Sequence, residues 1–172
     1  DDKWISGYVN NYPEHGDGYV TVIQTNKPEF KWSDATINFK RPNKNNLVIY
    51  ELWVYDHTPS RNIKGLIDRL NYIEDLGVNA VELMPITEFD GNDSWGYSPN
   101  HFFALDKVYG SPDELKTFID ECHKRGIAVI LDMVFNHATG LNPMNKLYPY
   151  GTDLSSNPWF NVNAPHSDNV YE

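Results

Sequence analysis

The chain has 172 residues, of which 24 are acidic and 14 basic, so its formal net charge at pH 7 is −10. This acidic balance, without any Lys/Arg cluster, excludes an ordinary nucleic-acid binder and disfavours a phosphorylated substrate. No apolar run approaches the roughly 20 residues that span a bilayer, and a single cysteine, Cys122, excludes an internal disulfide framework.

Residues 1–40 are rich in Tyr, Trp, Asn and Gly. The β-branched run at 19–25 (YVTVIQT) predicts a strand, and 36–39 is a weaker candidate for a second one. The polar stretch 41–46 (RPNKNN) is typical of a linker. We therefore predict a small β-rich N-terminal segment and linker over residues 1–46, followed by a different domain over 47–172.

From residue 47 onward, apolar runs alternate with helical patterns. Runs at 47–54 (LVIYELWV), 78–84 (VNAVELM) and 127–135 (IAVILDMVF) predict three strands, and the first carries one charge, Glu51, that we expect to be buried. Apolar residues at helical spacing predict a helix over 62–76. A second helix follows at 112–125, so the order β-α-β-α-β predicts a parallel sheet with right-handed crossovers.

Local signals mark the ends of the predicted helices. Ser111 is placed to cap the second helix, with Pro112 at its first position and Glu114 completing a capping box. Gly77 and Gly126 follow the two helices as C-terminal stops. Cys122 falls on the apolar stripe and is predicted to be a small core residue. After His137 the periodicity ends.

Functional groups in parallel α/β folds lie at the carboxyl ends of the strands. Three groups of polar and aromatic residues meet this condition, and we expect them to converge on one cleft. They are Tyr55, Asp56 and His57 after the first strand; Glu88, Trp95 and Tyr97 in the loop after the second; and Asp132, Asn136 and His137 at the end of the third.

These residues leave several interpretations open. A lone strand-end aspartate such as Asp132 is more often a structural hydrogen-bond acceptor than a catalytic group. Asn136 and His137 suit metal ligands, a substrate clamp or loop anchors. The six histidines, at 15, 57, 101, 123, 137 and 166, include no i,i+4 pair, which argues against a catalytic zinc site. No phosphate-binding glycine loop is present.

Three segments carry a family resemblance. They resemble the α-amylase family of glycoside hydrolases, on its branching-enzyme and pullulanase-like side. The segments are LVIYELWVYDHT, GVNAVELMPITEF with DSWGYSPNHFFALDKVYGSPDELK, and the run that ends in DMVFNH. DMVFNH matches the family motif D-x-x-x-N-H. The resemblance implies an α/β fold, a partial (β/α)₈ TIM barrel that contributes its first three strands. Residues 1–46 resemble the end of a preceding β-module.

The same resemblance implies roles for individual residues. Tyr97 would stack beneath the sugar at the cleavage point, with Trp95 beside it as a second substrate-binding aromatic. His137 would hydrogen-bond that sugar's primary hydroxyl. Asp132 and Asn136 would support the active site, and Asn136 matches a position that ligates calcium in many members, although no cofactor is required.

The family is retaining and needs two carboxylates about 5–5.5 Å apart. None of the 24 acidic residues lies in a segment that resembles the regions bearing them. Glu51, Glu82 and Glu88 are weak candidates, and Glu88 is the least unsuitable. We expect the chain to hold part of an α-glucan-binding cleft, to lack turnover by itself, and to self-associate or pair with the missing barrel half.

A second interpretation is a non-catalytic glycan-binding or interaction module derived from such an enzyme. Aromatic residues favour either reading, since 24 of the 172 are Trp, Tyr or Phe and flat rings match the C–H faces of sugars; core packing alone is the simpler explanation. Composition favours an exported protein, whereas a branching-enzyme-like member would be cytoplasmic. The sequence does not distinguish a hydrolase from a transglycosylase.

Overall fold

The computed structural model describes residues 25–91, 93–147 and 155–163. The chain divides into two compact units. The first contains the described residues up to Leu83 together with Lys107–Ile130. The second contains Met84–Asp106 and the described residues from Leu131 onward.

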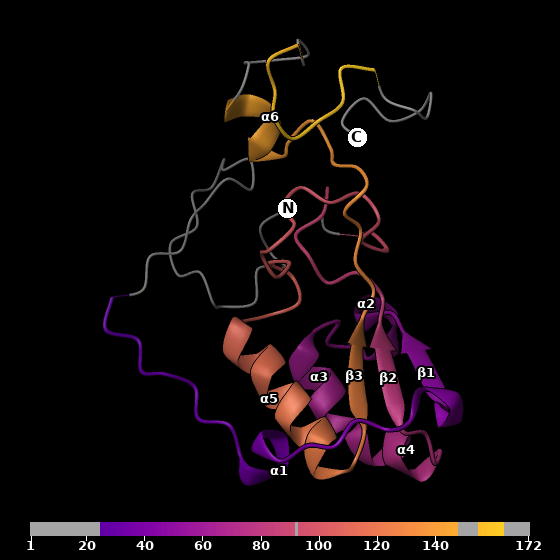
Figure 1. Ribbon diagram of the computed structural model, residues 1–172. Helices are drawn as coiled ribbons and strands as arrows, with labels where there is room; N and C mark the ends of the chain where they lie inside the picture. The colour runs from indigo at the N-terminus through magenta and orange to yellow at the C-terminus, as the bar shows by residue number, and fades with distance from the viewer. Residues whose placement is uncertain (1–24, 92, 148–154, 164–172) are drawn as a thin grey trace. The chain divides into compact units, whose positions relative to one another are not determined.

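The first unit is built around a sheet of three strands in the order β1-β2-β3. The strands are β1 (Ile49–Leu52), β2 (Ala80–Leu83) and β3 (Ala128–Leu131). β1 pairs with β2 in parallel, with Tyr50 opposite Val81, and Figure 1 shows all three arrows pointing the same way. This sheet agrees with the predicted α/β fold.

Helices occupy the predicted crossovers. α3 (Ile63–Asp68) and α4 (Leu70–Asp75) lie between β1 and β2, and α5 (Pro112–Lys124) precedes β3. The single helix predicted over 62–76 is interrupted at Arg69, whose φ of −101° and ψ of 0° leave the α region. The apolar stripe still holds, because Ile63, Leu66, Leu70 and Ile73 are all fully buried.

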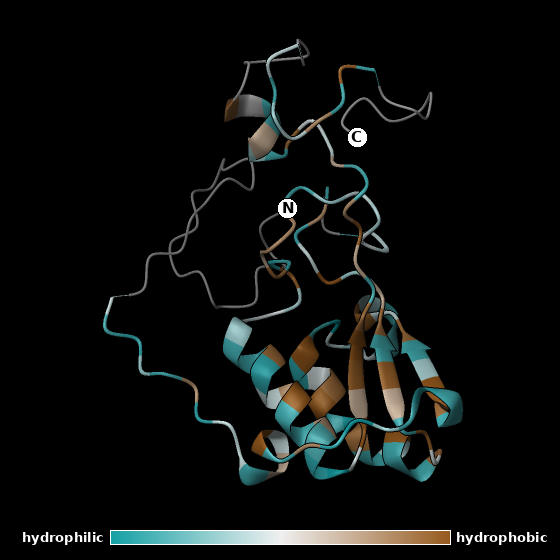
Figure 2. Ribbon diagram, in the orientation of Figure 1, coloured by the Kyte–Doolittle hydropathy of each residue, from teal (hydrophilic) through white to brown (hydrophobic). Residues whose placement is uncertain are grey.

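α5 is capped as the sequence predicts. The Ser111 hydroxyl accepts from the Glu114 backbone N–H, and the Glu114 carboxylate accepts from the Ser111 N–H at 2.7 Å. Gly77 and Gly126 both have φ of +72°, a conformation that favours glycine directly after a helix. Figure 2 shows hydrophilic and hydrophobic residues on α5 and a hydrophobic β3, whereas β1 and β2 also carry hydrophilic residues. The core includes Phe118 and Cys122 of α5 and Val81 and Leu83 of β2, all fully buried.

The N-terminal prediction is partly wrong. Residues 36–39 do not form a strand: α1 (Asp34–Ile37) takes in the first two of them, and a turn ends the helix at Asn38. A 3₁₀ helix, η2 (Lys44–Asn46), follows. The strand predicted at 19–25 lies almost wholly outside the described residues. Tertiary contacts explain the helix: the hydroxyls of Ser33 and Thr36 both donate to Asp120 of α5. The boundary at residue 46 stays a prediction.

The first strand is also less buried than its sequence indicates. Glu51 is exposed, as is Ile49 at 45%, because β1 is an outer strand of the sheet. The strand is shorter than predicted, since the short helix α2 (Val54–His57) begins two residues after Leu52. Outer strands carry an unpaired edge. Self-association through that edge stays a prediction.

The second unit is mostly loop. Its described residues contain the isolated antiparallel bridges Thr87–Leu105 and Phe89–Pro99 and the short helix α6 (Pro143–Leu147), in the region where the periodicity ends. Among the described helices of both units, none is long and apolar enough to cross a membrane.

Candidate functional site

The loop after β2 is shaped by a glycine turn. Gly96 has φ of +90°, and a Cβ at this position would lie 2.2 Å from the carbonyl oxygen of Pro85. The turn therefore packs against the backbone of Pro85, at a distance that only glycine permits. The Gly96 N–H donates to the Ser94 hydroxyl at 3.1 Å, and the turn delivers Tyr97 to the surface.

Tyr97 is held from two sides by the segment that follows β3. Its hydroxyl donates to Asp132 Oδ2 at 2.8 Å, and its backbone carbonyl accepts from His137 Nε2 at 2.7 Å. The tyrosine side chain and backbone stay 38% exposed in spite of these contacts. Loop and strand-end segments, 35 to 40 residues apart in the chain, thus meet within the second unit.

The loop that carries Tyr97 is closed by backbone hydrogen bonds. Glu88 N–H donates to the Ala104 carbonyl and Asp106 N–H to the Ile86 carbonyl, both at 2.8 Å. Asn100 is 8% exposed; its side-chain amide donates to the Phe89 carbonyl at 3.0 Å. These bonds close a loop in which Phe89 is fully buried.

A second connection to the strand-end segment was missed by the sequence analysis. Thr139 N–H donates to the Pro99 carbonyl at 3.1 Å, and the Thr139 hydroxyl donates to Asn100 Oδ1. Threonine and asparagine in an aperiodic stretch give no signal of this pairing. The only available hint was their position immediately after His137.

The other sequence-predicted residues are less closely joined. Trp95 is 62% exposed, beside the Gly96 turn. Glu88 is 7% exposed, so its carboxyl is not open to a polysaccharide chain. Asn136 is exposed, and its side-chain nitrogen lies 3.0 Å from His137 Nδ1.

The residues after β1 belong to the first unit. Tyr55 stacks on Trp53 with ring centroids 5.0 Å apart, and the Arg61 guanidinium lies 4.4 Å from its ring centre. Burial, and then the nearby Arg69 charge, lower the pKa of His57 below its usual value. The expected convergence of this group with Tyr97 stays a prediction.

A metal centre is not evident. Within residues 25–91, 93–147 and 155–163, no three His, Cys, Asp or Glu side chains are grouped so that they could hold an ion. Calcium prefers six to eight oxygen ligands. Calcium ligation by Asn136 stays a prediction.

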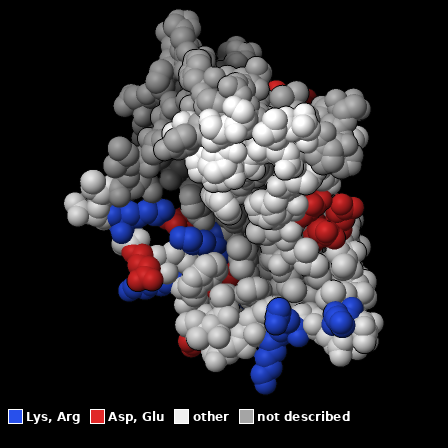
Figure 3. All heavy atoms as spheres, turned by 45° about the horizontal axis from the view of Figure 1, so that its top comes forward, with Lys and Arg blue, Asp and Glu red and all other residues white. Residues whose placement is uncertain are grey.

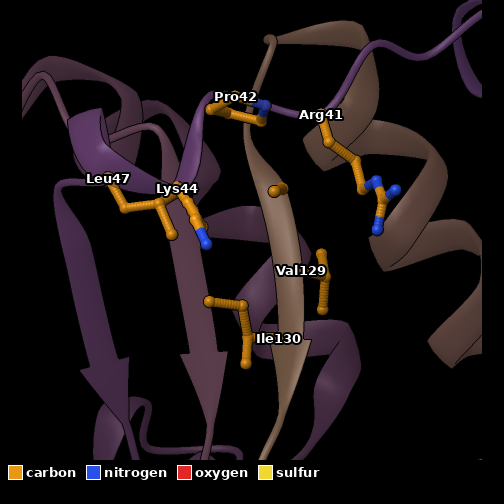
Figure 4. Close-up of a pocket in the computed structure, with 7 residues that line it drawn as sticks. Arg41, Pro42, Lys44, Leu47, Val129 and Ile130 are labelled. Carbon is orange, nitrogen blue, oxygen red and sulfur yellow. The ribbon is translucent and has the colours of Figure 1, made fainter.

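The first unit contains a large pocket that is separate from the predicted site residues. Its volume is about 780 Å³, and it opens on the sheet beside the stretch that precedes β1, as Figure 4 shows. None of the predicted site residues lines it. On the face drawn in Figure 3, basic and acidic side chains are interspersed at the left and form small groups at the right and bottom, with no extended basic area. The pocket is lined by Arg41, Pro42, Lys44, Leu47, Ala128, Val129 and Ile130.

Comparison with known proteins decides the family. The model of the alpha-amylase catalytic domain matches residues 29–169, which is most of the chain. The chain belongs to the alpha-amylase family. The matched range takes in every site residue predicted from the sequence, as well as the stretch from residue 29 that was assigned to a separate N-terminal segment.

Two curated proteins of the alpha-amylase family illustrate which members this chain is similar to. A malto-oligosyltrehalose trehalohydrolase from Saccharolobus solfataricus is 40% identical over 162 residues, 92% of this chain and 28% of the relative. A 1,4-alpha-glucan branching enzyme from Xanthomonas campestris is 37% identical over 129 residues, 70% of this chain and 18% of the relative. The chain thus spans between 18% and 28% of the length of these alpha-amylase-family relatives.

Solved structures of alpha-amylases resemble part of this chain. A putative alpha amylase from Salmonella typhimurium superposes with a TM-score of 0.55 at 33% identity, covering 63% of this chain and 20% of that one. An alpha-amylase from Lactobacillus plantarum gives a TM-score of 0.56 at 27% identity, over 60% and 26% of the two chains. Both likenesses support the partial barrel.

Proposed function

We propose that this alpha-amylase-family chain provides one wall of an α-glucan-binding cleft, with Tyr97 as the platform for a sugar ring. One observation carries the proposal: Asp132 and His137 hold Tyr97 from two sides while the side chain stays 38% exposed. A fixed, partly exposed aromatic ring offers a flat apolar face that suits the C–H face of a pyranose.

The neighbouring residues take supporting roles in this proposal. Trp95, at 62% exposure, supplies a second ring for the glucan, and His137 contributes a hydrogen bond to a sugar hydroxyl. Asp132 acts through Tyr97, because its carboxylate accepts the tyrosine hydroxyl at 2.8 Å. Truncating Tyr97 to alanine would remove the platform, whereas Tyr97→Phe would remove only the hydroxyl contact.

The chemistry requires groups that we place elsewhere in the full-length protein. In a retaining mechanism one carboxylate attacks the anomeric carbon while a carboxylic acid protonates the leaving oxygen. Water or a sugar hydroxyl then resolves the glycosyl-enzyme intermediate, giving hydrolysis or transglycosylation. We infer that neither carboxylate lies within these 172 residues, and the burial of Glu88 at 7% exposure supports this.

The identity of the relatives favours one substrate class. Malto-oligosyltrehalose trehalohydrolases match with identities up to 41%, and the branching enzyme with 37%. We propose that the parent enzyme hydrolyses a malto-oligosaccharide that carries a trehalose end. Transfer of glucan branches is the second candidate, favoured by the Xanthomonas relative.

Binding and turnover test the proposal separately. Titration of the chain with malto-oligosyltrehalose, followed by NMR, is expected to shift the indole N–H signal of Trp95 and to produce no trehalose. Tyr97→Ala should abolish the shift, while Tyr72→Ala, which removes a 44%-exposed tyrosine of the first unit, should not. Equal binding by the Tyr97→Ala variant would refute the platform.

The assignment of the carboxylates has its own test. Clear turnover by the 172-residue chain, abolished by Glu88→Gln, would contradict the proposal that the catalytic groups lie elsewhere. A non-catalytic glycan-binding module is the alternative from another class. Activity that emerges when the chain is extended downstream supports an enzyme; binding without turnover in the extended protein supports the module.

A further inference from the structure

The geometry around His137 determines which of its ring nitrogens carries the proton. His137 Nε2 lies 2.7 Å from the Tyr97 backbone oxygen, and a carbonyl oxygen can only accept a hydrogen bond. His137 Nε2 must therefore be the donor. In a neutral imidazole the other nitrogen, Nδ1, then has a lone pair and no hydrogen.

Asn136 supplies the matching donor. Its side-chain nitrogen lies 3.0 Å from His137 Nδ1, so the amide N–H donates to the lone pair. The opposite orientation of the amide would place an oxygen lone pair against the lone pair of Nδ1. Asn136, His137 and the Tyr97 carbonyl thus form a directed chain of hydrogen bonds in which each donor has one acceptor.

We propose that Asn136 is a positioning residue: its amide keeps His137 in the Nε2–H tautomer, and His137 in turn holds the Tyr97 backbone in the glucan-free protein. This inference deepens the proposed function, on which it rests for the role of Tyr97 as a sugar platform. The residue that directs the tautomer is adjacent to His137 in the chain.

The chain of bonds completes a three-point fixation of Tyr97. The hydroxyl is held by Asp132 at 2.8 Å, the carbonyl by His137, and the preceding Gly96 packs on Pro85. A side chain already fixed in its binding conformation loses less conformational entropy when a ligand arrives. A sugar hydroxyl that contacts His137 Nε2 would have to share the N–H that Tyr97 uses.

The tautomer can be observed directly. Long-range ¹H–¹⁵N correlation spectra of the histidine-labelled chain at about pH 8, where a free imidazole is neutral, distinguish Nε2–H from Nδ1–H rings. The wild-type chain should show Nε2–H for His137. Asn136→Asp replaces the donor by a carboxylate acceptor and should move the proton to Nδ1, with a change in the Tyr97 carbonyl ¹³C shift.

Loss of the His137 bond should also weaken binding of malto-oligosyltrehalose about threefold to tenfold, the usual effect of one hydrogen bond. Asn161→Asp is the matched control, because Asn161 is an exposed asparagine of the same unit. It adds the same charge and should change neither the tautomer nor the affinity.

Three results would overturn the inference: Nδ1–H in the wild-type chain, an unchanged tautomer in Asn136→Asp, or an unchanged Tyr97 carbonyl shift when the proton has moved. None of these readouts depends on glucan. A wild-type chain that binds no glucan would count against the proposed function alone, and the tautomer and carbonyl shift would still decide the inference.

Discussion

Replacing Asp120 with alanine should release the segment before β1 from α5. Asp120 is 6% exposed, and one carboxylate oxygen, Oδ1, accepts three hydrogen bonds. The donors are the Ser33 backbone N–H at 3.0 Å, the Ser33 hydroxyl at 2.8 Å and the Thr36 hydroxyl at 2.7 Å. Lys124 Nζ lies 3.1 Å from the other oxygen but is largely exposed.

The expected loss follows from this count. A hydrogen bond to a charged group contributes about 1.5–3 kcal/mol, but bonds that share one oxygen are not additive. Water recovers part of the loss, because Ser33 and Thr36 are only half-buried. We expect Asp120→Ala to cost about 2–4 kcal/mol of local stability, and Asp120→Asn, which keeps a neutral acceptor, about half of that.

Amide hydrogen exchange at Ser33 measures this opening. A loss of about 2 kcal/mol should speed exchange of the Ser33 N–H roughly thirtyfold, while amides in the core of β2 change little. Asp34→Ala is the control, since Asp34 is exposed on α1 and should shift local stability by less than about 0.5 kcal/mol. Equal Ser33 exchange in wild type and Asp120→Ala would refute the reasoning.

The same contact should weaken in acid. Burial by itself would raise the pKa of Asp120, but the hydrogen bonds from Thr36 and Ser33 outweigh it and hold this pKa well below its usual range. The stabilisation is therefore complete above about pH 4 and is lost as the pH falls through the folded-state pKa.

Burial also lowers the pKa of His123, whose Nδ1 lies 3.0 Å from the Thr36 hydroxyl. That contribution begins to fade below about pH 6.5. The protection factor of the Ser33 amide, which is the intrinsic exchange rate at each pH divided by the measured rate, should fall across both ranges, and a loss of protection confined to pH values above 7 would contradict this sign.

Three further outcomes test local features. Gly96→Ala should cost about 1–3 kcal/mol in urea denaturation, because its Cβ would meet Pro85 O at 2.2 Å, whereas Gly91→Ala, with nothing within 4 Å, should cost less. Burial raises the pKa of Cys122 to about 12, so mass spectrometry should find its thiol unalkylated by iodoacetamide at pH 8 until the chain is unfolded in urea. Ser111→Ala should lower the urea midpoint by the equivalent of about 1 kcal/mol, and a Ser111→Asp variant that loses as much would argue against the cap.

Short-range patterns predicted the frame of the first unit. Apolar runs placed β1, β2 and β3, and Ser111 and Glu114 formed the capping box that begins α5. These features depend on residues within a few positions of one another, so propensity and periodicity suffice to find them. The same holds for Cys122, whose burial follows from its place on the apolar stripe of α5.

Predictions failed where distant residues compete with local preference. Residues 36–39 read as a strand, but Thr36 reaches Asp120, 84 positions later, and α1 forms instead. Glu51 was expected to be buried on the strength of its apolar neighbours, yet exposure depends on whether another strand lies beside β1.

By itself, then, the sequence determined the parallel βα frame, the α5 cap and the motifs that mark the family, because each is written in a contiguous stretch. Only the tertiary structure decided that Tyr97 is held by Asp132 and His137, 35 and 40 residues downstream. Contacts between such distant segments produce no periodic pattern in the sequence. The hydrogen bonds that fix the candidate sugar platform became visible only once the two segments were folded against each other.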